Sequence, residues 1–178
     1  MTTPTGGGPQ PPRGGIVVGV DGSPGSLAAL RWAVREASRR GLALHAVTAW
    51  EFPVESTFGD MTTVGDFHPV VAAEKILLSA LADAGVTVDD PTVTTAPVKG
   101  HPAEVLMQMA KRAELLVVGS RGHGRIFGAL LGSVSHYVAA HAACPVVVIK
   151  AVANRSGRTY RSDVNGGAGP SATCIVVR

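Results

Sequence analysis

The sequence predicts a three-layer α/β sandwich in which helices cover both faces of a mostly parallel, five-stranded sheet. Two short apolar runs rich in β-branched residues, Ile16 to Val20 and Leu115 to Val118, are typical of strands buried on both faces. Segments with a helical spacing of apolar residues alternate with such runs, in the order βαβαβαβαβ. This order favours parallel strands joined by right-handed crossovers, with ligands bound at the carboxyl ends of the strands.

Three further segments complete the predicted sheet. They are Leu42 to Trp50, Val86 to Val98 and Pro145 to Ile149. The first of them is less clear as a strand, because His45 and Thr48 interrupt its apolar pattern.

The predicted helices carry recognisable start and stop signals. Ser23 can act as the N-cap of the first helix with Pro24 at its first position, and Gly41 ends the apolar periodicity. The other helices are expected from about Pro69 to Ala84 with Gly85 as C-cap, from Pro102, and from near Ser133.

Length and composition favour one soluble domain. The chain has 178 residues, of which 46% are hydrophobic and 16% charged, and one domain is the default at this length. No stretch approaches the roughly 20 apolar residues of a membrane-spanning helix, and the Gly/Pro/Thr-rich start is unlike a secretory signal. Two cysteines make no disulfide framework, so we expect a cytoplasmic protein without membrane association.

The positive net charge lies outside the predicted domain. The chain carries +3, but residues 15–149 contain 10 Lys/Arg against 12 Asp/Glu. The basic excess belongs to the flanks, which contain Arg155, Arg158 and Arg161. A nucleic-acid partner is therefore not expected.

The flanks and one long connection differ from the rest of the chain. Residues 1–14 and 151–178 are predicted to be disordered tails around a domain at 15–150, although Cys174 to Val177 could instead add an edge strand. The segment Glu51 to His68 is too long for a tight connection and is either a lid or a variable loop.

A glycine-rich stretch outlines a phosphate site. Gly119-Ser120-Arg121-Gly122 follows the strand at 115–118, and after nine residues comes Gly132-Ser133-Val134-Ser135, where a helix should start. Glycines let main-chain N–H groups approach an anion, and a helix N-terminus adds free N–H groups, its positive dipole end and serine hydroxyls. The pattern is neither a Walker A loop nor a dinucleotide fingerprint, and tight turns alone would also explain the glycines.

The spacing Gly119-x2-Gly122-x9-Gly132-Ser133 resembles the ATP-binding signature of the universal stress proteins. Three other pieces are similar to that family, and the combination spans about residues 15–150. They are the segment from Val18 to Ser23, Gly100-His101-Pro102, and the last strand with its preceding cysteine, Cys144 to Val148. The resemblance implies a Rossmann-like fold with strand order 3-2-1-4-5 and a homodimer whose last strands, Pro145 to Ile149, pair across the two-fold axis.

The resemblance also implies a binding site for ATP, with Mg²⁺ on the phosphates. Asp21 would reach the ribose side and Val47 would line the adenine pocket, although Ala46-Val47 allows a register shift of one residue. The remaining implied contacts border the nucleotide or wrap its ribose and phosphates: Val118, Gly119, Gly122, Gly132, Ser133, Val134 and Ser135.

Other polar residues have both a functional and a structural explanation. Arg121 could touch phosphate or be solvated, and Asp21 could form only a local turn. His123 lacks a paired nucleophile, so a solvated histidine is the simpler hypothesis. Arg125 could touch phosphate but, as a loop arginine, is more simply explained as solvated. The remaining histidines have no zinc-ligand spacing with a cysteine, so no metal site made by protein side chains is expected.

Three functions follow from the sequence. The first is an ATP-binding stress-response or regulatory protein that is not a fast enzyme. The second is an enzyme of the adenine nucleotide α-hydrolase-like fold, which would need a positioned base or nucleophile. The third is a dimerisation module without nucleotide, against which the intact glycine signature argues.

Overall fold

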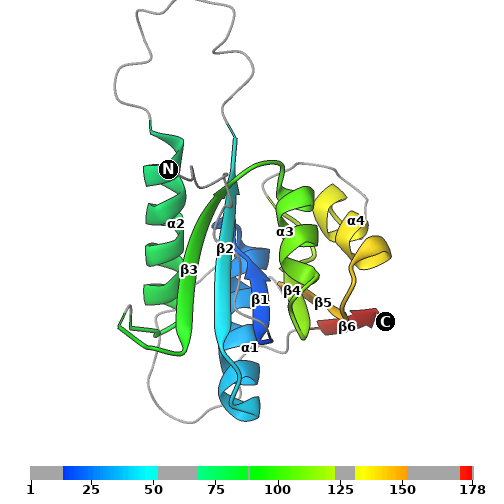
Figure 1. Cartoon of the computed structure of the whole chain (residues 1–178), viewed down its shortest axis with the longest axis horizontal. Coiled ribbons are helices and arrows are strands. Elements are labelled where there is room, and N and C mark those ends of the chain that lie inside the picture. The colour runs from blue at the N-terminus through cyan, green and yellow to red at the C-terminus, as the bar shows by residue number, and fades with distance from the viewer. Residues whose placement is uncertain (1–13, 52–67, 88, 123–130, 152–172, 178) are drawn as a thin grey trace, which may run out of the picture.

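The computed structural model describes residues 14–51, 68–87, 89–122, 131–151 and 173–177. Strands and helices alternate as predicted from β1 to β5 (Figure 1). The strands are β1 (Ile16–Gly19), β2 (Leu44–Trp50), β3 (Val93–Lys99), β4 (Leu115–Gly119), β5 (Val146–Lys150) and β6 (Thr173–Val177). The helices are α1 (Pro24–Arg40), α2 (Pro69–Asp83), α3 (Pro102–Ala110) and α4 (Ser133–His141).

The sheet has the order β3-β2-β1-β4-β5-β6. Strands β1 to β5 are parallel, which confirms the predicted order 3-2-1-4-5. Strand β6 pairs antiparallel with β5 and forms the edge of the sheet. The prediction of a disordered tail is therefore wrong for residues 173–177, and the alternative of an edge strand is correct. Residues 1–13 and 152–172 lie outside the described part of the chain.

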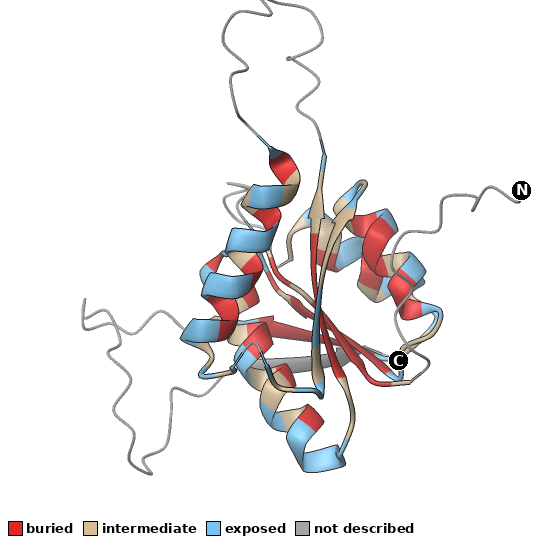
Figure 2. Ribbon diagram, turned by 60° about the vertical axis from the view of Figure 1, so that its left-hand side comes forward, coloured by how far each residue is buried: buried red, intermediate tan, exposed pale blue. Residues whose placement is uncertain are grey.

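Helices cover both faces of the sheet, and each face has its own hydrophobic core (Figure 2). Side chains of neighbouring strand residues point to opposite faces, so Val18 packs in the α1/α2 core and Val17 in the α3/α4 core. Both are fully buried. This two-sided burial explains why β1 and β4 are continuously apolar rather than alternating.

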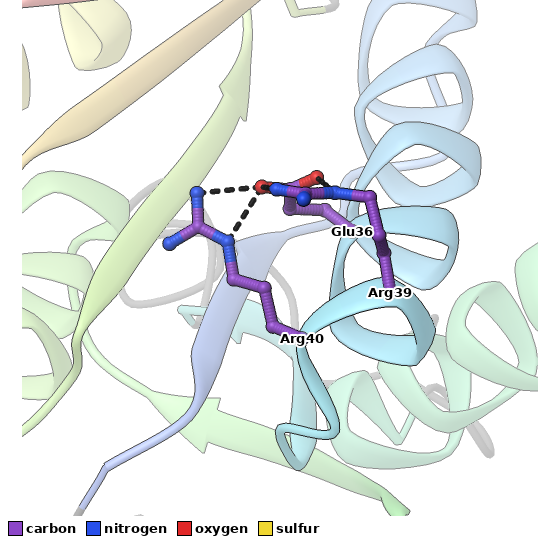
Figure 3. A network of polar contacts seen from close by, with 3 residues as sticks. All are labelled: Glu36, Arg39 and Arg40. Carbon is purple, nitrogen blue, oxygen red and sulfur yellow. Dashed lines mark hydrogen bonds and ion pairs between the residues drawn. The ribbon is translucent and has the colours of Figure 1, made fainter.

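Helix α1 begins and ends at the residues the sequence indicated. The Ser23 hydroxyl accepts the N–H of Ser26 (3.2 Å), and Gly41 adopts a left-handed conformation with φ 65°. In the last turns, Glu36 accepts hydrogen bonds from Arg39 (2.8 and 3.0 Å) and Arg40 (2.6 Å) (Figure 3). The Arg39 guanidinium, supported by Arg40, lowers the pKa of Glu36 to about 2.

The start of β3 differs from the prediction. The strand begins at Val93 rather than at Val86, because Asp90 forms a turn in which its Oδ1 accepts the N–H (2.9 Å) and the hydroxyl (2.6 Å) of Thr92. The turn interrupts an apparent β pattern that runs on both sides of it.

The polar residues that made β2 unclear are buried and hydrogen-bonded. His45 Nδ1 lies 2.6 Å from Thr94 Oγ1, and Thr48 donates to the carbonyl of Val20 at 2.7 Å. Burial lowers the pKa of His45. Thr48 is thus satisfied within the strand, whereas His45 is satisfied on one side of its ring only, because its Nε2 atom is buried without a hydrogen-bond partner among the described residues.

Candidate functional site

A cavity opens at the carboxyl ends of β1 and β4, between the two halves of the sheet. Strands β2 and β3 extend from β1 in one direction, and β5 lies beyond β4 in the other. The chain reverses its winding at this point, so the connections after β1 and β4 diverge and leave a crevice. The cavity has a volume of about 220 Å³, just below the range of roughly 300–1,000 Å³ typical of small-molecule pockets.

All ten residues proposed from the sequence as nucleotide contacts line this one cavity. They come from the turn after β1, from β2 and β4, from the loop after β4 and from the start of α4: Asp21, Val47, Val118, Gly119, Arg121, Gly122, Gly132, Ser133, Val134 and Ser135. Residues as far apart in sequence as Asp21 and Ser135 thus meet in space, because parallel strands end at the same edge of the sheet.

One wall of the cavity is apolar. Val47 and Val118 are 2% and 4% exposed, and Ala49 and Leu106 join them in the lining. The register Gly19↔Val47 places Val47 on the strand beside β1. A flat apolar ring fits such a wall, since it needs burial and few polar partners.

Asp21 is held in place at the end of β1. Its Oδ1 accepts the N–H of Ser23 at 2.9 Å, and its own N–H donates to Ser26 Oγ at 3.2 Å. The local turn considered from the sequence is therefore present, and the residue also lines the cavity. The turn fixes the position of the only carboxylate among the lining residues that the structure describes.

The glycines of the site have different physical roles. A Cβ atom at Gly119 would lie 2.5 Å from the carbonyl carbon of Gly25 and 2.7 Å from the nitrogen of Ser26. Gly119 therefore lets α1 pack against the end of β4. At Gly122 a Cβ would collide with the Asp21 carboxylate. At Gly132 a Cβ would meet nothing closer than 3.6 Å, so the fold itself does not require glycine there.

The N-terminus of α4 has no side-chain cap. Gly132 is the N-cap, and the first intrahelical bond runs from His136 N to Gly132 O at 2.9 Å. The N–H groups of Ser133, Val134 and Ser135 therefore have no acceptor within the helix. All three residues line the cavity, so donors and the positive end of the helix dipole face it.

The hydroxyl of Ser135 has a structural role. It lies 3.0 Å from both the Ser120 and the Gly132 carbonyl oxygens, to which it donates. Its single proton is therefore used within the protein, and we expect Ser135 to offer a ligand its main-chain N–H instead. The Ser133 side chain is exposed and is not restrained in this way.

The loop after β4 is closed at its base. Ser120 O also accepts the N–H of Gly132 at 2.7 Å, and Ser23 Oγ donates to Arg121 O at 3.3 Å. Arg121 itself is exposed at the rim. His123 and Arg125 lie outside the described residues.

The sequence interpretation missed several contributors. Ser26, Pro102 and Leu106 line the cavity, and Gly25 lies close to the loop: a Cβ there would be 2.6 Å from Arg121 O. The pair Pro24-Gly25 directly after an N-cap was a usable signal for such a close approach. Over the described ranges, no three His, Cys, Asp or Glu side chains gather as metal ligands. The helices in these ranges also include none that is long and apolar enough to cross a membrane.

The fold and the cavity define a doubly wound α/β domain with a small-molecule site at its switch point. The chain belongs to the universal stress protein family, whose model matches residues 13–150. It is 40% identical over 147 residues to universal stress protein Rv2005c of Mycobacterium tuberculosis, covering 80% of this chain and 47% of that protein. The chain thus spans about half the length of the curated relatives it matches.

Solved structures agree with this assignment. A universal stress protein crystallised in complex with cAMP is 32% identical, with a TM-score of 0.53 over 76% of this chain and 94% of that chain. The universal stress protein UspA of Lactobacillus plantarum shares the fold at 24% identity, with a TM-score of 0.56 over 76% and 96% of the two chains.

Proposed function

We propose that this chain binds ATP in the cavity, with the adenine against the wall of Val47 and Val118 and the phosphates at the N-terminus of α4. The observation that carries the proposal is that an apolar wall and an uncapped helix N-terminus face the same cavity. A ring with a charged phosphate tail matches both. The relative crystallised with cAMP, at 32% identity, supports an adenine nucleotide.

The adenine wall predicts a preference for ATP over GTP. The Val47 carbonyl already accepts the N–H of Val20 at 2.8 Å, and the side chains of Val47 and Val118 offer no polar partner. The additional polar groups of guanine would lose their water there without compensation. Titration calorimetry with ATP, GTP, AMP and cAMP tests this, and equal affinity for ATP and GTP would contradict the adenine assignment.

Mg²⁺ would accompany the phosphates. It commonly binds one or two carboxylates together with substrate phosphates and several waters. The sequence predicted no side-chain ligand for a metal and placed Asp21 at the ribose side, but the cavity adds one to the proposal: Asp21 is the carboxylate of the described lining, and its turn with Ser23 fixes its position. We expect Asp21→Asn to weaken ATP binding more in the presence of Mg²⁺ than in EDTA, whereas equal weakening would leave Asp21 to the ribose alone.

The proposed role is regulatory, with slow or absent turnover. The cavity offers N–H donors and one carboxylate, and no histidine, lysine or cysteine is among its described lining residues. Phosphate release faster than about one per second would instead make the chain an ATPase. His123→Ala then shows whether that residue serves as the base. Absence of binding to any nucleotide would favour the third function, a dimerisation module.

The homodimer through Pro145 to Ile149 and the cytoplasmic location are further parts of the proposal. An exposed apolar edge strand is an aggregation hazard that pairing with a second copy would remove. In the structure β6 occupies this edge. The dimer therefore requires β6 to leave β5.

A further inference from the structure

Strand β6 closes the β5 edge of the sheet (Figure 1). It runs antiparallel to β5 along its whole length, from Val146↔Val177 to Lys150↔Thr173. Residues 146–149 of β5 are at most 3% exposed. The C-terminal strand thus completes the sheet where the parallel order ends.

The neighbouring hydrogen bonds show which main-chain groups of β5 face this edge. Leu116 N donates to Pro145 O (3.0 Å) and Ser120 N donates to Ile149 O (2.7 Å). Odd-numbered residues of β5 therefore direct their main-chain groups to β4, and the even-numbered ones direct theirs to β6. In β6 the facing residues are 173, 175 and 177, by the register of the ladder.

The two edges of the parallel sheet are protected in different ways. On β3, Thr92 O accepts Leu44 N (2.8 Å) and Gly100 N donates to Trp50 O (2.9 Å), so odd-numbered residues face outward. Pro97 is one of them and presents no N–H to an incoming strand. Strand β5, with the sequence VVVIK, has no proline at its outward positions 146, 148 and 150, and only the last of these carries a charge, that of Lys150. Its edge therefore depends on being covered.

The cover resembles a second copy of β5. A two-fold axis beside this edge would bring the β5 of another chain alongside in antiparallel orientation, which is the orientation of β6. The residues TCIVV of β6 are also largely β-branched, as are VVVI of β5. One edge can pair with only one of these strands at a time.

We infer that β6 and the β5 strand of a second copy compete for the β5 edge, so that β6 keeps the chain monomeric until it is displaced. The inference rests on the homodimer in the proposed function and adds the element that controls it. The pairing of β6 with β5 of the same chain does not depend on protein concentration, whereas the pairing of β5 with β5 of a second copy is favoured at high concentration. The chain therefore carries a built-in competitor for its own dimer interface.

A pair of proline variants of the full chain tests this. Ile175→Pro removes an N–H that faces β5 and should release β6, whereas Val176→Pro removes one that faces away and should leave β6 paired. In sedimentation velocity over a concentration series, we expect the wild type and Val176→Pro to be monomers. Ile175→Pro should dimerise with at least about tenfold higher affinity.

Hydrogen exchange at the amides of Val148 and Lys150 provides the second measurement, because both face β6. They should be protected in the wild-type monomer, and in Ile175→Pro they should lose protection on dilution. A monomeric Ile175→Pro with these amides exposed would overturn both the competition and the dimer. A wild-type dimer that Ile175→Pro leaves intact, or that Val176→Pro breaks, would overturn the competition alone. Calorimetry with ATP on the same variants tests the nucleotide site separately, since no described residue of β6 lines it.

Discussion

Replacing Gly132 by serine should stabilise the protein and weaken its affinity for ATP. Gly132 is the N-cap of α4 with φ −72° and ψ 166°, a conformation that serine adopts readily at this position. The nearest atoms to a Cβ there are Arg121 Cα and Ser120 O, both at 3.6 Å. The side chain therefore fits, and its hydroxyl can accept the N–H of Ser135.

The size of each effect follows from known contributions. Replacing a glycine reduces the conformational entropy of the unfolded chain, which stabilises the folded protein by about 0.4–1 kcal/mol. A serine N-cap is more stabilising than a glycine N-cap by a few tenths of a kcal/mol. A gain of about 1 kcal/mol would raise the Tm by roughly 2–4 °C for a domain of this size. The cap occupies an N–H proposed for phosphate, and loss of a hydrogen bond to a charged group costs about 1.5–3 kcal/mol, or roughly 10- to 100-fold in affinity.

Calorimetric unfolding without nucleotide and titration with ATP measure the two effects. His68→Ser is the matched control, because α2 also lacks a side-chain cap at its extended N-cap residue and does not line the cavity. It should gain stability without a change in ATP affinity. If Gly132→Ser binds ATP as tightly as the wild type, the phosphates do not use the N-terminus of α4.

Three other outcomes are expected. Gly119→Ala should lower the free energy of unfolding by about 1–3 kcal/mol in urea titrations, because the added Cβ would meet backbone atoms at 2.5 and 2.7 Å; an unchanged midpoint would contradict this. Glu36→Gln should cost only about 0.5–1 kcal/mol at pH 7, since its arginine partners are 68% and 42% exposed. The pKa of Glu36 in the folded protein is lowered to about 2, so its contribution to the free energy of unfolding is complete above its ordinary pKa of 4.5 and is lost as the pH falls toward 2. The stabilities of the wild type and Glu36→Gln should therefore become equal in acid. Burial raises the pKa of Cys144, so iodoacetamide at pH 7.5 should label it more slowly than a free cysteine peptide, as followed by peptide mass spectrometry. Equal labelling rates would show that the surroundings of Cys144 open to solvent.

Local signals in the sequence were sufficient to predict most helices and strands of the parallel part of the domain. The Ser23-Pro24 start and the Gly41 end of α1 each follow from the chemistry of one or two residues, and the structure has both. The predicted start of β3 was wrong, because Asp90 forms a turn inside an apparent strand pattern. Such a turn competes with a β-branched pattern whose periodicity continues on both sides.

The contacts across the site could be anticipated only in part. The glycine spacing indicated the loop after β4 and the start of α4, and the structure brings these together with Asp21 and Val47 at one cavity. The use of the Ser135 hydroxyl and the requirement for Gly119 beside α1 depend on long-range packing, which spacing along the chain does not encode. The pairing of β6 depends on which edge of the sheet lacks a partner, a property of the assembled sheet alone.

Pro97 has a consequence for stoichiometry. If two copies join at their β5 edges, the outermost strands of the continuous sheet are the two β3 strands, each with Pro97 at an outward position where it presents no N–H. A third copy would have no complete row of donors on which to add a strand. Growth by edge pairing should therefore stop at two chains, so that exposure of β5 leads to a closed particle of fixed size rather than to a filament.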